Sequence, residues 1–559
     1  MADALQQAME LLDQQQWAAC EQLLGSILHI DPNHPHALQL LADLHARQGH
    51  YLGNSGHLDK AVRHYNKAIQ IDPHHYEAQA NLGVVHTLRG DPDQALIHFL
   101  QTQTLNGQIP DSHYMMGMNH RQAGRIEEAK NCFQAYLTQA APPAEAASEW
   151  SQRFEEVIAL QHFGRSGTLW LHSLFDSHPH ISTIPGVRFN DFFTPSVQAH
   201  LIPDHNQPHW RSMLVDRFVE CYRFLFDPCG LRYPSENDDA ARVGLNCMGD
   251  HRDHQLSLDE TAFGKHLHTL LKPHTQMDTR TLFKLVHQAF DQTLRRDVEA
   301  SRKILFHSHN SQGEGFRHLL AHFPKVRLLT AVREPVQSLE SLLYDTLFNT
   351  ADPKSGHQQV EMMRQEFRQA LYQQASGHLQ VMWGNMLLAP HGVIPSAGVR
   401  LEDLKTQPQA MMTKLAEWIG IDFHESLFQS SFQGVPYWGP SSKLSPKLRA
   451  FDNSGVKRKV GALFSQRDTF LFATLLYPIR VHFGYQPRDD DTFRRDLKKC
   501  RSMLYVPLDF EKEWLDGQPP EAHPAYRAFH NNLKAIWRTL NMRTQRADNW
   551  QGLPQWLRL

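Results

Sequence analysis

The chain has 559 residues, of which 41% are hydrophobic and 21% are charged. At about 100 to 200 residues per domain, this length predicts two to four domains with hydrophobic cores, and the composition excludes a largely disordered chain. Lysine and arginine together number 56 against 59 aspartates and glutamates, which gives a formal net charge of -3. This balance excludes the basic surface of a general nucleic-acid-binding protein, so any anion-binding site must be local.

The cysteines and histidines indicate neither disulfides nor a metal site. The six cysteines include no C-x-x-C pair and no dense framework, which is typical of a reducing compartment. The 37 histidines form no metal-ligand spacing such as H-E-x-x-H. The N-terminal sequence lacks the basic and apolar regions of a signal peptide, and no run approaches the ~18 apolar residues of a membrane span. We therefore expect a cytoplasmic protein with no membrane span and no metal.

The first quarter of the chain repeats with a period of 34 residues. Gly56, Gly90 and Gly124 are spaced by this period, and an alanine follows each of them five residues later. The sequence Ile-Asp-Pro that begins at Ile30 recurs at Ile71, one period plus seven residues further on. A helix-turn-helix unit explains this pattern, with glycine at the turn, a small residue where the helices touch, and proline after the second helix.

These features resemble the tetratricopeptide repeat. About four copies fit residues 3–140, the first with Cys20 in place of the small alanine. One copy cannot bury its apolar face, so stacking stabilises the array. The resemblance implies a concave groove that holds a peptide or a protein. The alternative is an array that only packs on the rest of this chain or dimerises. A proline pair in an alanine-rich run then breaks the pattern and predicts a linker over residues 142–150.

A glycine loop follows the next apolar segment, residues 157–162, which we predict to be a strand. Arg165, Ser166, Gly167 and Thr168 form this loop, and helical spacing of apolar residues comes next. A strand, a glycine loop and a helix make an anion-binding geometry, to which the arginine adds a cation and the hydroxyls add donors. The loop is not a G-x-x-x-x-G-K-[ST] phosphate loop, because it is too short and lacks the lysine.

A second strand and loop of the same kind lie further along the chain. Residues 326–332 predict a buried strand, and Pro335 fits the first turn of a helix after it. Arg333 then lies at the carboxyl end of the strand, and Ser341 lies nearly two turns into the helix. Both side chains can reach a ligand that lies across the strand ends. The alternative is that Arg333 only pairs with a neighbouring glutamate.

Together the two loops resemble the sulfotransferase family, whose donor is 3′-phosphoadenosine 5′-phosphosulfate. In that family a [KR]-S-G-T loop grips the 5′-phosphosulfate, and an arginine with a serine eight residues later binds the 3′-phosphate. Residues 165–168 fill the first pattern, and Arg333 with Ser341 fill the second. The Asp-Ser-His-Pro sequence from Asp176 also resembles the family. Leu169 departs from the family pattern, because many members carry a second threonine or serine at this position. The loop therefore offers one hydroxyl fewer to the phosphosulfate.

Later segments agree in order with the same family. Residues 399–404 resemble its V-R-Y-E-D-L segment, and Gly461 with residues 483–485 resembles its late V-G-x-W…L-G-Y stretch. The resemblance implies an α/β domain with a central parallel sheet flanked by helices, preceded by the all-α array. The predicted domains are 1–141 for the array, 142–150 for the linker, 151–487 for the sulfotransferase domain with an acceptor-site region at 189–300, and 488–559 for an unassigned extension.

Sulfuryl transfer to a hydroxyl needs an in-line acceptor, a base, and positive charge where the departing phosphate oxygen gains charge. We expect Arg165 to supply that charge. The strand over residues 303–309 resembles the K-T-H strand end of the cytosolic small-molecule sulfotransferases, whose histidine is the base. In this correspondence His309 stands at the position of the base and His307 at the position of the lysine. His307 is the alternative candidate for the base. A neutral histidine is suited to this role near pH 7.

Arg458 and Lys459 complete the predicted donor-binding residues, because they resemble an Arg-Lys-Gly run that touches the 3′-phosphate in small-molecule members. The alternative is a basic loop that is only solvated surface. The predicted function is sulfuryl transfer to a hydroxyl of a sugar, a tyrosine or a small molecule, without a metal. The alternative is a catalytically degenerate sulfotransferase fold that serves as a peptide-binding adaptor. A nucleotide kinase is disfavoured, because the chain has neither a phosphate-loop lysine nor a magnesium-ligand pattern.

Overall fold

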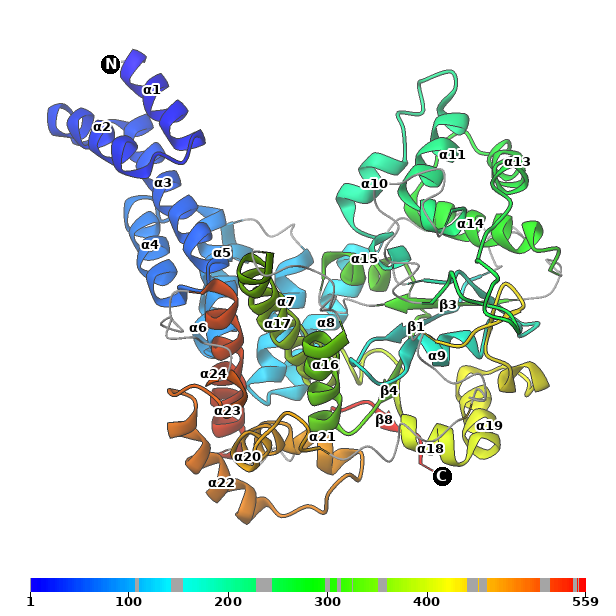
Figure 1. Cartoon of the computed structure of the whole chain (residues 1–559). Coiled ribbons are helices and arrows are strands. Elements are labelled where there is room, and N and C mark those ends of the chain that lie inside the picture. Colours follow the sequence, from blue (N-terminus) through cyan, green and yellow to red (C-terminus); the bar gives the residue numbers. More distant parts are fainter. Residues whose placement is uncertain are drawn as a thin grey trace. The chain divides into compact units, whose positions relative to one another are not determined.

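Figure 1 shows the chain as a computed structural model, which describes residues 2–105, 110–141, 154–186, 188–227, 244–296, 302–308, 313–323, 325–349, 359–439, 451, 460–512, 523–545, 550 and 552–558. The chain divides into two compact units. The first, here the repeat unit, comprises residues 1–136, 339–383 and 460–552. The second, here the sheet unit, comprises residues 137–338, 384–459 and 553–559.

The repeat unit begins with helices that stack in antiparallel pairs, as the 34-residue period predicted. They are α1 (Ala2–Asp13), α2 (Trp17–Ile30), α3 (Pro35–Asn54), α4 (Leu58–Ile71), α5 (Tyr76–Arg89), α6 (Pro92–Leu105), α7 (Pro110–Gln122) and α8 (Ile126–Ala140). The seven extra residues between the two Ile-Asp-Pro sequences lengthen α3, which has 20 residues where α5 has 14. Seven residues are close to two helical turns, so the longer helix keeps its apolar face toward its neighbours.

The repeated residues perform the same task in each copy. Gly56, Gly90 and Gly124 make the turns with left-handed φ angles of 76°, 74° and 79°. In the first copy Gln15 adopts this conformation instead, with φ of 58°. The alanine that follows each glycine is buried. Cys20 replaces it in the first copy and is also buried, so the small-residue contact between helices is retained in all four copies.

The remainder of the repeat unit is also helical. Its helices are α17 (Gln359–Trp383), α20 (Gln466–Leu475), α21 (Tyr477–His482), α22 (Asp490–Met503), α23 (Asp509–Lys512), α24 (Pro524–Thr544) and most of α16 (Pro335–Asn349). The helix α24 lies beside α5 and α17 (Figure 1). Most of the predicted C-terminal extension, for which the sequence offered no role, thus folds with the repeats.

The turns between the helices of the array contact α24 of the same chain. Arg527 Nε donates a hydrogen bond of 3.0 Å to the Ser55 carbonyl, and Arg538 Nη1 donates one of 2.7 Å to the Arg89 carbonyl. These carbonyls lie at successive turns of the array, so one helix spans two repeats. Both are helix-terminal carbonyls with no partner inside their own helices, and arginine side chains satisfy them.

Replacing Gly90 with alanine should destabilise the repeat unit. An added Cβ would lie 2.7 Å from the Ala535 carbonyl oxygen on α24, so one of the two backbones must move. We expect a loss of about 1–3 kcal/mol beyond the strain of a left-handed alanine, measured by thermal unfolding. The matched control is Gly434→Ala, which has the same left-handed φ but nothing within 4 Å of its added Cβ. Equal effects of the two substitutions would contradict the docking of α24 on the array.

The sheet unit is built on a six-stranded parallel sheet with strand order β2-β3-β1-β4-β5-β8. The strands are β1 (Val157–Gln161), β2 (Ile181–Thr183), β3 (Lys303–Ser308), β4 (Arg327–Val332), β5 (Ser396–Arg400) and β8 (Gln555–Trp556), and β6 (Ser431–Phe432) pairs with β7 (Val435–Pro436) in a separate hairpin. This confirms the α/β fold with a central parallel sheet. β1 lies between β3 and β4, so the carboxyl ends of these three strands meet at one edge, where open α/β sheets bind ligands.

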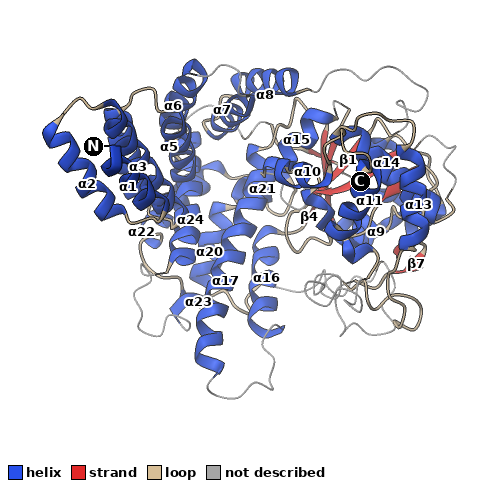
Figure 2. Ribbon diagram, turned by 90° about the horizontal axis from the view of Figure 1, so that it is seen from above, coloured by secondary structure: helices blue, strands red, loops and turns tan. Residues whose placement is uncertain are grey.

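Helices surround this sheet (Figure 2). They are α9 (Thr168–Ser173), η1 (Arg188–Asp191), α10 (Pro195–Leu201), α11 (Trp210–Cys221), η2 (Arg223–Leu225), α13 (Glu260–Leu271), α14 (Thr279–Thr293), α15 (Glu314–His322), η3 (Gly384–Leu388), α18 (Leu401–Thr406), α19 (Pro408–Ile419) and η4 (Glu425–Phe428). Thr183 bonds to His172 of α9, whereas Ser182 bonds to His287 of α14. Successive strand residues point to opposite faces, so these helices cover opposite sides of the sheet.

Candidate functional site

The predicted anion-binding loop follows β1 directly and is here called the β1 loop, residues 162–167. Gly167 precedes α9 with φ of 76°, and a Cβ added there would lie 2.9 Å from Leu401 Cδ1. The left-handed backbone conformation therefore favours glycine, whereas the Leu401 side chain could shift to admit a Cβ. The Ser166 and Thr168 side chains are buried with their hydroxyl oxygens 3.2 Å apart, while Arg165 is exposed. The loop thus places two hydroxyls side by side at the end of the central strand.

Arg333 contacts the β1 loop. It follows β4 and is 9% exposed, and its Nη1 donates a 3.0 Å hydrogen bond to the Arg165 carbonyl. The neighbouring strands are also joined by their side chains, since Thr330 Oγ1 donates to Gln161 Oε1 at 3.1 Å. The two loops that the sequence singled out, 168 residues apart, therefore meet at one edge of the sheet.

Ser341 lies on α16, eight residues after Arg333, in the part of the helix that belongs to the repeat unit. Next to it, the buried Glu340 carboxylate accepts hydrogen bonds from the backbone N–H groups of Gly461 (3.0 Å), Leu463 (2.8 Å) and Phe464 (2.9 Å). These bonds attach the segment around Gly461 to α16. The Glu340 carboxylate therefore holds this segment on α16.

His307 lies at the end of β3, the strand next to β1, and is 5% exposed. Its ring packs at 84° against that of His172, with the ring centroids 5.7 Å apart. His172 is fully buried, and its Nε2 pairs with Thr183 Oγ1. Burial lowers the pKa of His172 to about 4, because the charged ring would lose its hydration. His172 is therefore a neutral neighbour of His307 at pH 7.

Three of the predicted site residues lie outside the described residues, namely His309, Arg458 and Lys459. Their assignments stay predictions. The described residues that precede or follow them are Ser308 at the end of β3 and Val460, which leads into the turn held by Glu340.

Asp176 of the Asp-Ser-His-Pro sequence holds a distant hairpin. Its fully buried carboxylate accepts hydrogen bonds from the Ser431 hydroxyl (3.2 Å) and from the N–H groups of Gln433 (3.1 Å) and Gly434 (2.9 Å). Arg296 Nη2 donates to the same carboxylate at 3.0 Å. The sequence identified this residue only as part of a motif, since its partners come from the β6–β7 hairpin and from the segment just after α14.

Replacing Asp176 with asparagine should destabilise the sheet unit by about 2 kcal/mol, because the partly buried Arg296 loses a charged partner and two backbone donors lose a charged acceptor. Urea unfolding measures this change. The control is Asp13→Asn, which weakens an exposed pair with Arg47 of 2.9 Å and should cost well under about 1 kcal/mol. An equally small effect at Asp176 would show that the hairpin does not depend on this carboxylate.

Leu169 stands where many sulfotransferases carry a hydroxyl residue, and it packs into an apolar cluster. The buried members of this cluster are Leu245, Met248, Leu256, Phe432 and Tyr437. The leucine therefore joins α9 to the segment 244–258 and to the β6–β7 hairpin. Its position is explained by packing, at a point where the predicted acceptor-site region meets the helix that follows the β1 loop.

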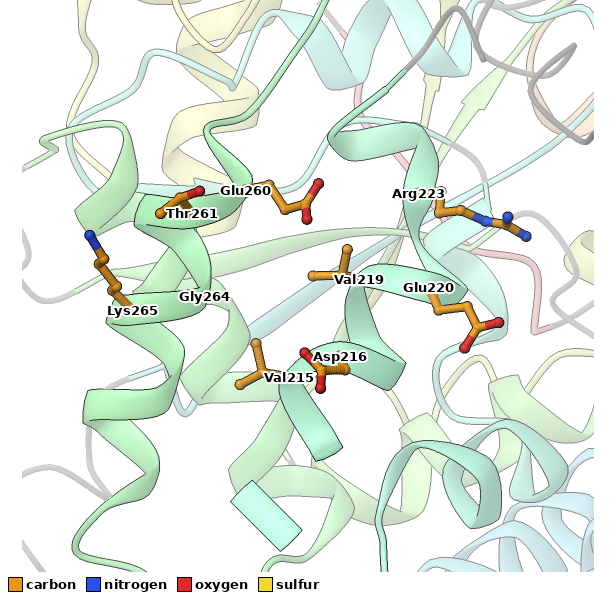
Figure 3. Close-up of a pocket in the computed structure, with 9 residues that line it drawn as sticks. All are labelled: Val215, Asp216, Val219, Glu220, Arg223, Glu260, Thr261, Gly264 and Lys265. Carbon is orange, nitrogen blue, oxygen red and sulfur yellow. The ribbon is translucent and has the colours of Figure 1, made fainter. Parts of the chain in front are cut away.

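A pocket of about 390 Å³ lies elsewhere, between α11 and α13 (Figure 3). Its lining residues are Val215, Asp216, Val219, Glu220, Arg223, Glu260, Thr261, Gly264 and Lys265. None of the predicted site residues lines it. Within the described ranges, no group of three or more histidine, cysteine, aspartate or glutamate side chains is placed to hold a metal ion. None of the helices described is both long and apolar enough to cross a membrane.

The chain thus contains an α/β unit with a central parallel sheet and a unit with a helical repeat array, and family comparison identifies both parts. Residues 163–425 match the model of the sulfotransferase family. Residues 42–75 and 110–141 each match a model of the tetratricopeptide repeat. The chain therefore combines tetratricopeptide repeats with a sulfotransferase-family domain, as the motifs predicted.

Solved structures with similarity to the chain include proteins of both kinds. The sulfotransferase domain of the Synechococcus PCC 7002 olefin synthase is 15% identical, with coverage of 60% of this chain and 97% of its own and a TM-score of 0.30. The sulfotransferase domain of the curacin biosynthetic pathway is 14% identical, with coverage of 57% and 96% and a TM-score of 0.26. MamA is 16% identical, with coverage of 24% and 93% and a TM-score of 0.18. A comparison with curated proteins returned no match.

Proposed function

We propose that this protein is a sulfotransferase that moves a sulfuryl group from 3′-phosphoadenosine 5′-phosphosulfate to a hydroxyl acceptor. The hydrogen bond from Arg333 Nη1 to the Arg165 carbonyl, 3.0 Å long, is the observation that carries this proposal. It joins the two loops whose sequences resemble the 5′-phosphosulfate and 3′-phosphate sites of the family. A buried guanidinium at the carboxyl edge of a parallel sheet is suited to a phosphate, because it offers several donors in a fixed plane.

The donor-binding roles follow from this arrangement. The Ser166 and Thr168 hydroxyls and the Gly167 backbone bind the 5′-phosphosulfate, and Arg165 balances the charge that develops on the departing phosphate oxygen. Arg333 and Ser341 bind the 3′-phosphate and so discriminate against nucleotides that lack it. Arg458 and Lys459 add positive charge to the same phosphate.

In the reaction, the acceptor oxygen forms a bond to sulfur while the bond between sulfur and the bridging phosphate oxygen breaks. A base takes the hydroxyl proton, and adenosine 3′,5′-bisphosphate leaves. We assign the base to His309, with His307 as the alternative. The position of β3 supports this assignment, because β3 pairs with β1 and the His162 N–H donates to the Ser308 carbonyl at 3.1 Å. A side chain at the end of β3 is therefore next to the β1 loop.

The acceptor is a hydroxyl of a sugar, a tyrosine or a small molecule, bound by the region 189–300. The packing of Leu169 against the segment 244–258 supports this, because it places part of that region on α9. The tetratricopeptide repeats bind a peptide or protein through surfaces other than the turns that α24 occupies.

Thermal unfolding with added nucleotides tests the donor. Adenosine 3′,5′-bisphosphate, AMP and ATP are compared in the absence of magnesium. A ligand at 100 times its Kd stabilises the folded protein by about 2.7 kcal/mol, so the bisphosphate should raise Tm at concentrations where AMP and ATP do not. An equal response to AMP would overturn the proposed 3′-phosphate site. A panel of hydroxyl acceptors with sulfur-labelled donor then tests transfer. Bisphosphate binding without any labelled product would favour the adaptor alternative.

A further inference from the structure

A short π-helical turn, Gly384–Leu388, follows α17 and precedes β5. Such turns are rare, since their hydrogen bonds are wider than those of an α-helix, and they are frequent at functional sites. Asn385 lies in this turn and is fully buried in the sheet unit. No feature of the local sequence singles this residue out, because its partner lies 223 residues away.

Asn385 holds the first peptide of the β1 loop. Its Nδ2 donates a hydrogen bond to the His162 carbonyl, while its own backbone carbonyl is paired with His391 Nε2. The His162 N–H donates to the Ser308 carbonyl of β3 at 3.1 Å. The residue that starts the loop is thus fixed on one side by the sheet and on the other by the π-helical turn.

The β1 loop is therefore held at two carbonyls, His162 by Asn385 and Arg165 by Arg333. A peptide group is planar, and in the trans form its N–H points opposite to its carbonyl. Fixing the His162 carbonyl thus sets the orientation of its peptide plane and turns the Phe163 N–H the other way, whereas the Ser166 N–H, on the peptide held by Arg333, donates to the Gly164 carbonyl. A loop that binds an anion through its backbone depends on this orientation.

In the part of the chain that the structure describes, only one end of the Asn385 carboxamide, its Nδ2, has a hydrogen-bond partner. Within the described residues its Oδ1 accepts no hydrogen bond, although the side chain is fully buried. A buried acceptor without a partner destabilises a fold by about 1–3 kcal/mol, so packing and stability do not account for an asparagine at this position. Its bond to the β1 loop does.

We propose that Asn385 is a positioning residue for the sulfuryl donor: by holding the His162 carbonyl it sets the β1 loop in the conformation that binds the 5′-phosphosulfate. This inference rests on the proposed function of the loop. Asn385 acts through the backbone of the loop and contacts no reacting atom.

The test uses the full chain with Asn385→Ala and Asn385→Asp, and calorimetric titration with adenosine 3′,5′-bisphosphate. We expect about tenfold weaker binding by the alanine variant, as for a lost hydrogen bond. The aspartate variant should bind more weakly still, because a carboxylate oxygen would face the His162 carbonyl oxygen. Once an acceptor is known, the donor KM should rise while the pH profile stays unchanged, because Asn385 is not the group that takes the proton.

The matched control is Asn532→Ala, in the repeat unit. Asn532 is 9% exposed, and its Nδ2 donates to Ser376 Oγ at 2.6 Å. Its loss should lower Tm and leave the Kd unchanged, which separates an effect on the loop from an effect on stability. If Asn385→Ala fails to fold, Asn385→Ser gives the same comparison, with weaker binding expected.

The outcomes distinguish the two levels of the proposal. If the wild-type protein does not bind the bisphosphate, the proposed function itself is wrong. If the wild-type protein binds it and a folded Asn385 variant binds equally well, the positioning role is wrong while the function stands.

Discussion

Replacing Arg333 with alanine should weaken the binding of adenosine 3′,5′-bisphosphate about a hundredfold, while AMP binding falls less. The bisphosphate loses charge-assisted hydrogen bonds to its 3′-phosphate, and a hundredfold change corresponds to about 2.7 kcal/mol. Arg333 also holds the Arg165 carbonyl, so some loss of AMP binding is expected from the disturbed β1 loop. Calorimetric titration of both nucleotides measures the ratio of their affinities, which should fall toward one.

Two further variants sharpen this comparison. Arg333→Lys keeps the charge but loses the planar fork, so it should show an intermediate ratio. Arg327 lies at the opposite end of the same strand, where its Nη1 donates to the Trp418 carbonyl at 2.6 Å. Arg327→Ala should therefore cost stability and leave the ratio unchanged. An unchanged ratio in Arg333→Ala would remove the 3′-phosphate assignment.

Replacing His309 with alanine should lower turnover by about 10²- to 10⁴-fold, as for the loss of a general base, while bisphosphate binding persists. Single-turnover rates with sulfur-labelled donor and calorimetric Kd values separate the two effects. His307→Ala is the partner experiment, because His307 is the alternative base. A large loss of turnover in His307→Ala with little change in His309→Ala would move the base to His307.

The pH dependence of turnover gives an independent reading of the base. A histidine base must be neutral, so the rate should fall as the pH drops below the ordinary imidazole pKa of about 6.5. The pKa of His172 is lowered to about 4 by burial, so this ring stays neutral through that range and does not produce the acid limb. Variants that lack the base but retain residual activity should no longer show the fall in rate at acid pH. A pH-independent rate in the wild-type protein would contradict a histidine base.

The sequence predicted those parts of the fold that rest on local periodicity. The 34-residue spacing of Gly56, Gly90 and Gly124 predicted the array, because each turn needs the same left-handed residue. The seven extra residues between the two Ile-Asp-Pro sequences were visible as a change of period, and the structure places them in α3, because a helix accommodates seven residues as about two turns. The packing of α24 along the array was not predictable, since Arg527 and Arg538 form no pattern with the turns they contact.

In the candidate site, too, some features were predictable from the sequence and others were not. The meeting of Arg165 with Arg333 follows from chain order and topology, because the carboxyl ends of adjacent parallel strands lie together. Asn385 and the role of Asp176 were not predictable, since both depend on pairs more than 200 residues apart that only the folded chain creates. Leu169 was noted as a departure from the family pattern, and only its apolar neighbours give the reason for it.

In the proposed function, the β1 loop binds the 5′-phosphate of the nucleotide and Arg333 binds its 3′-phosphate. The most direct test is a crystal structure of the protein with adenosine 3′,5′-bisphosphate. We predict the 5′-phosphate on the β1 loop, within hydrogen-bonding distance of Thr168, and the 3′-phosphate on the Arg333 guanidinium. A nucleotide bound elsewhere, for example in the pocket between α11 and α13, or one whose 3′-phosphate points away from Arg333, would contradict the proposed function.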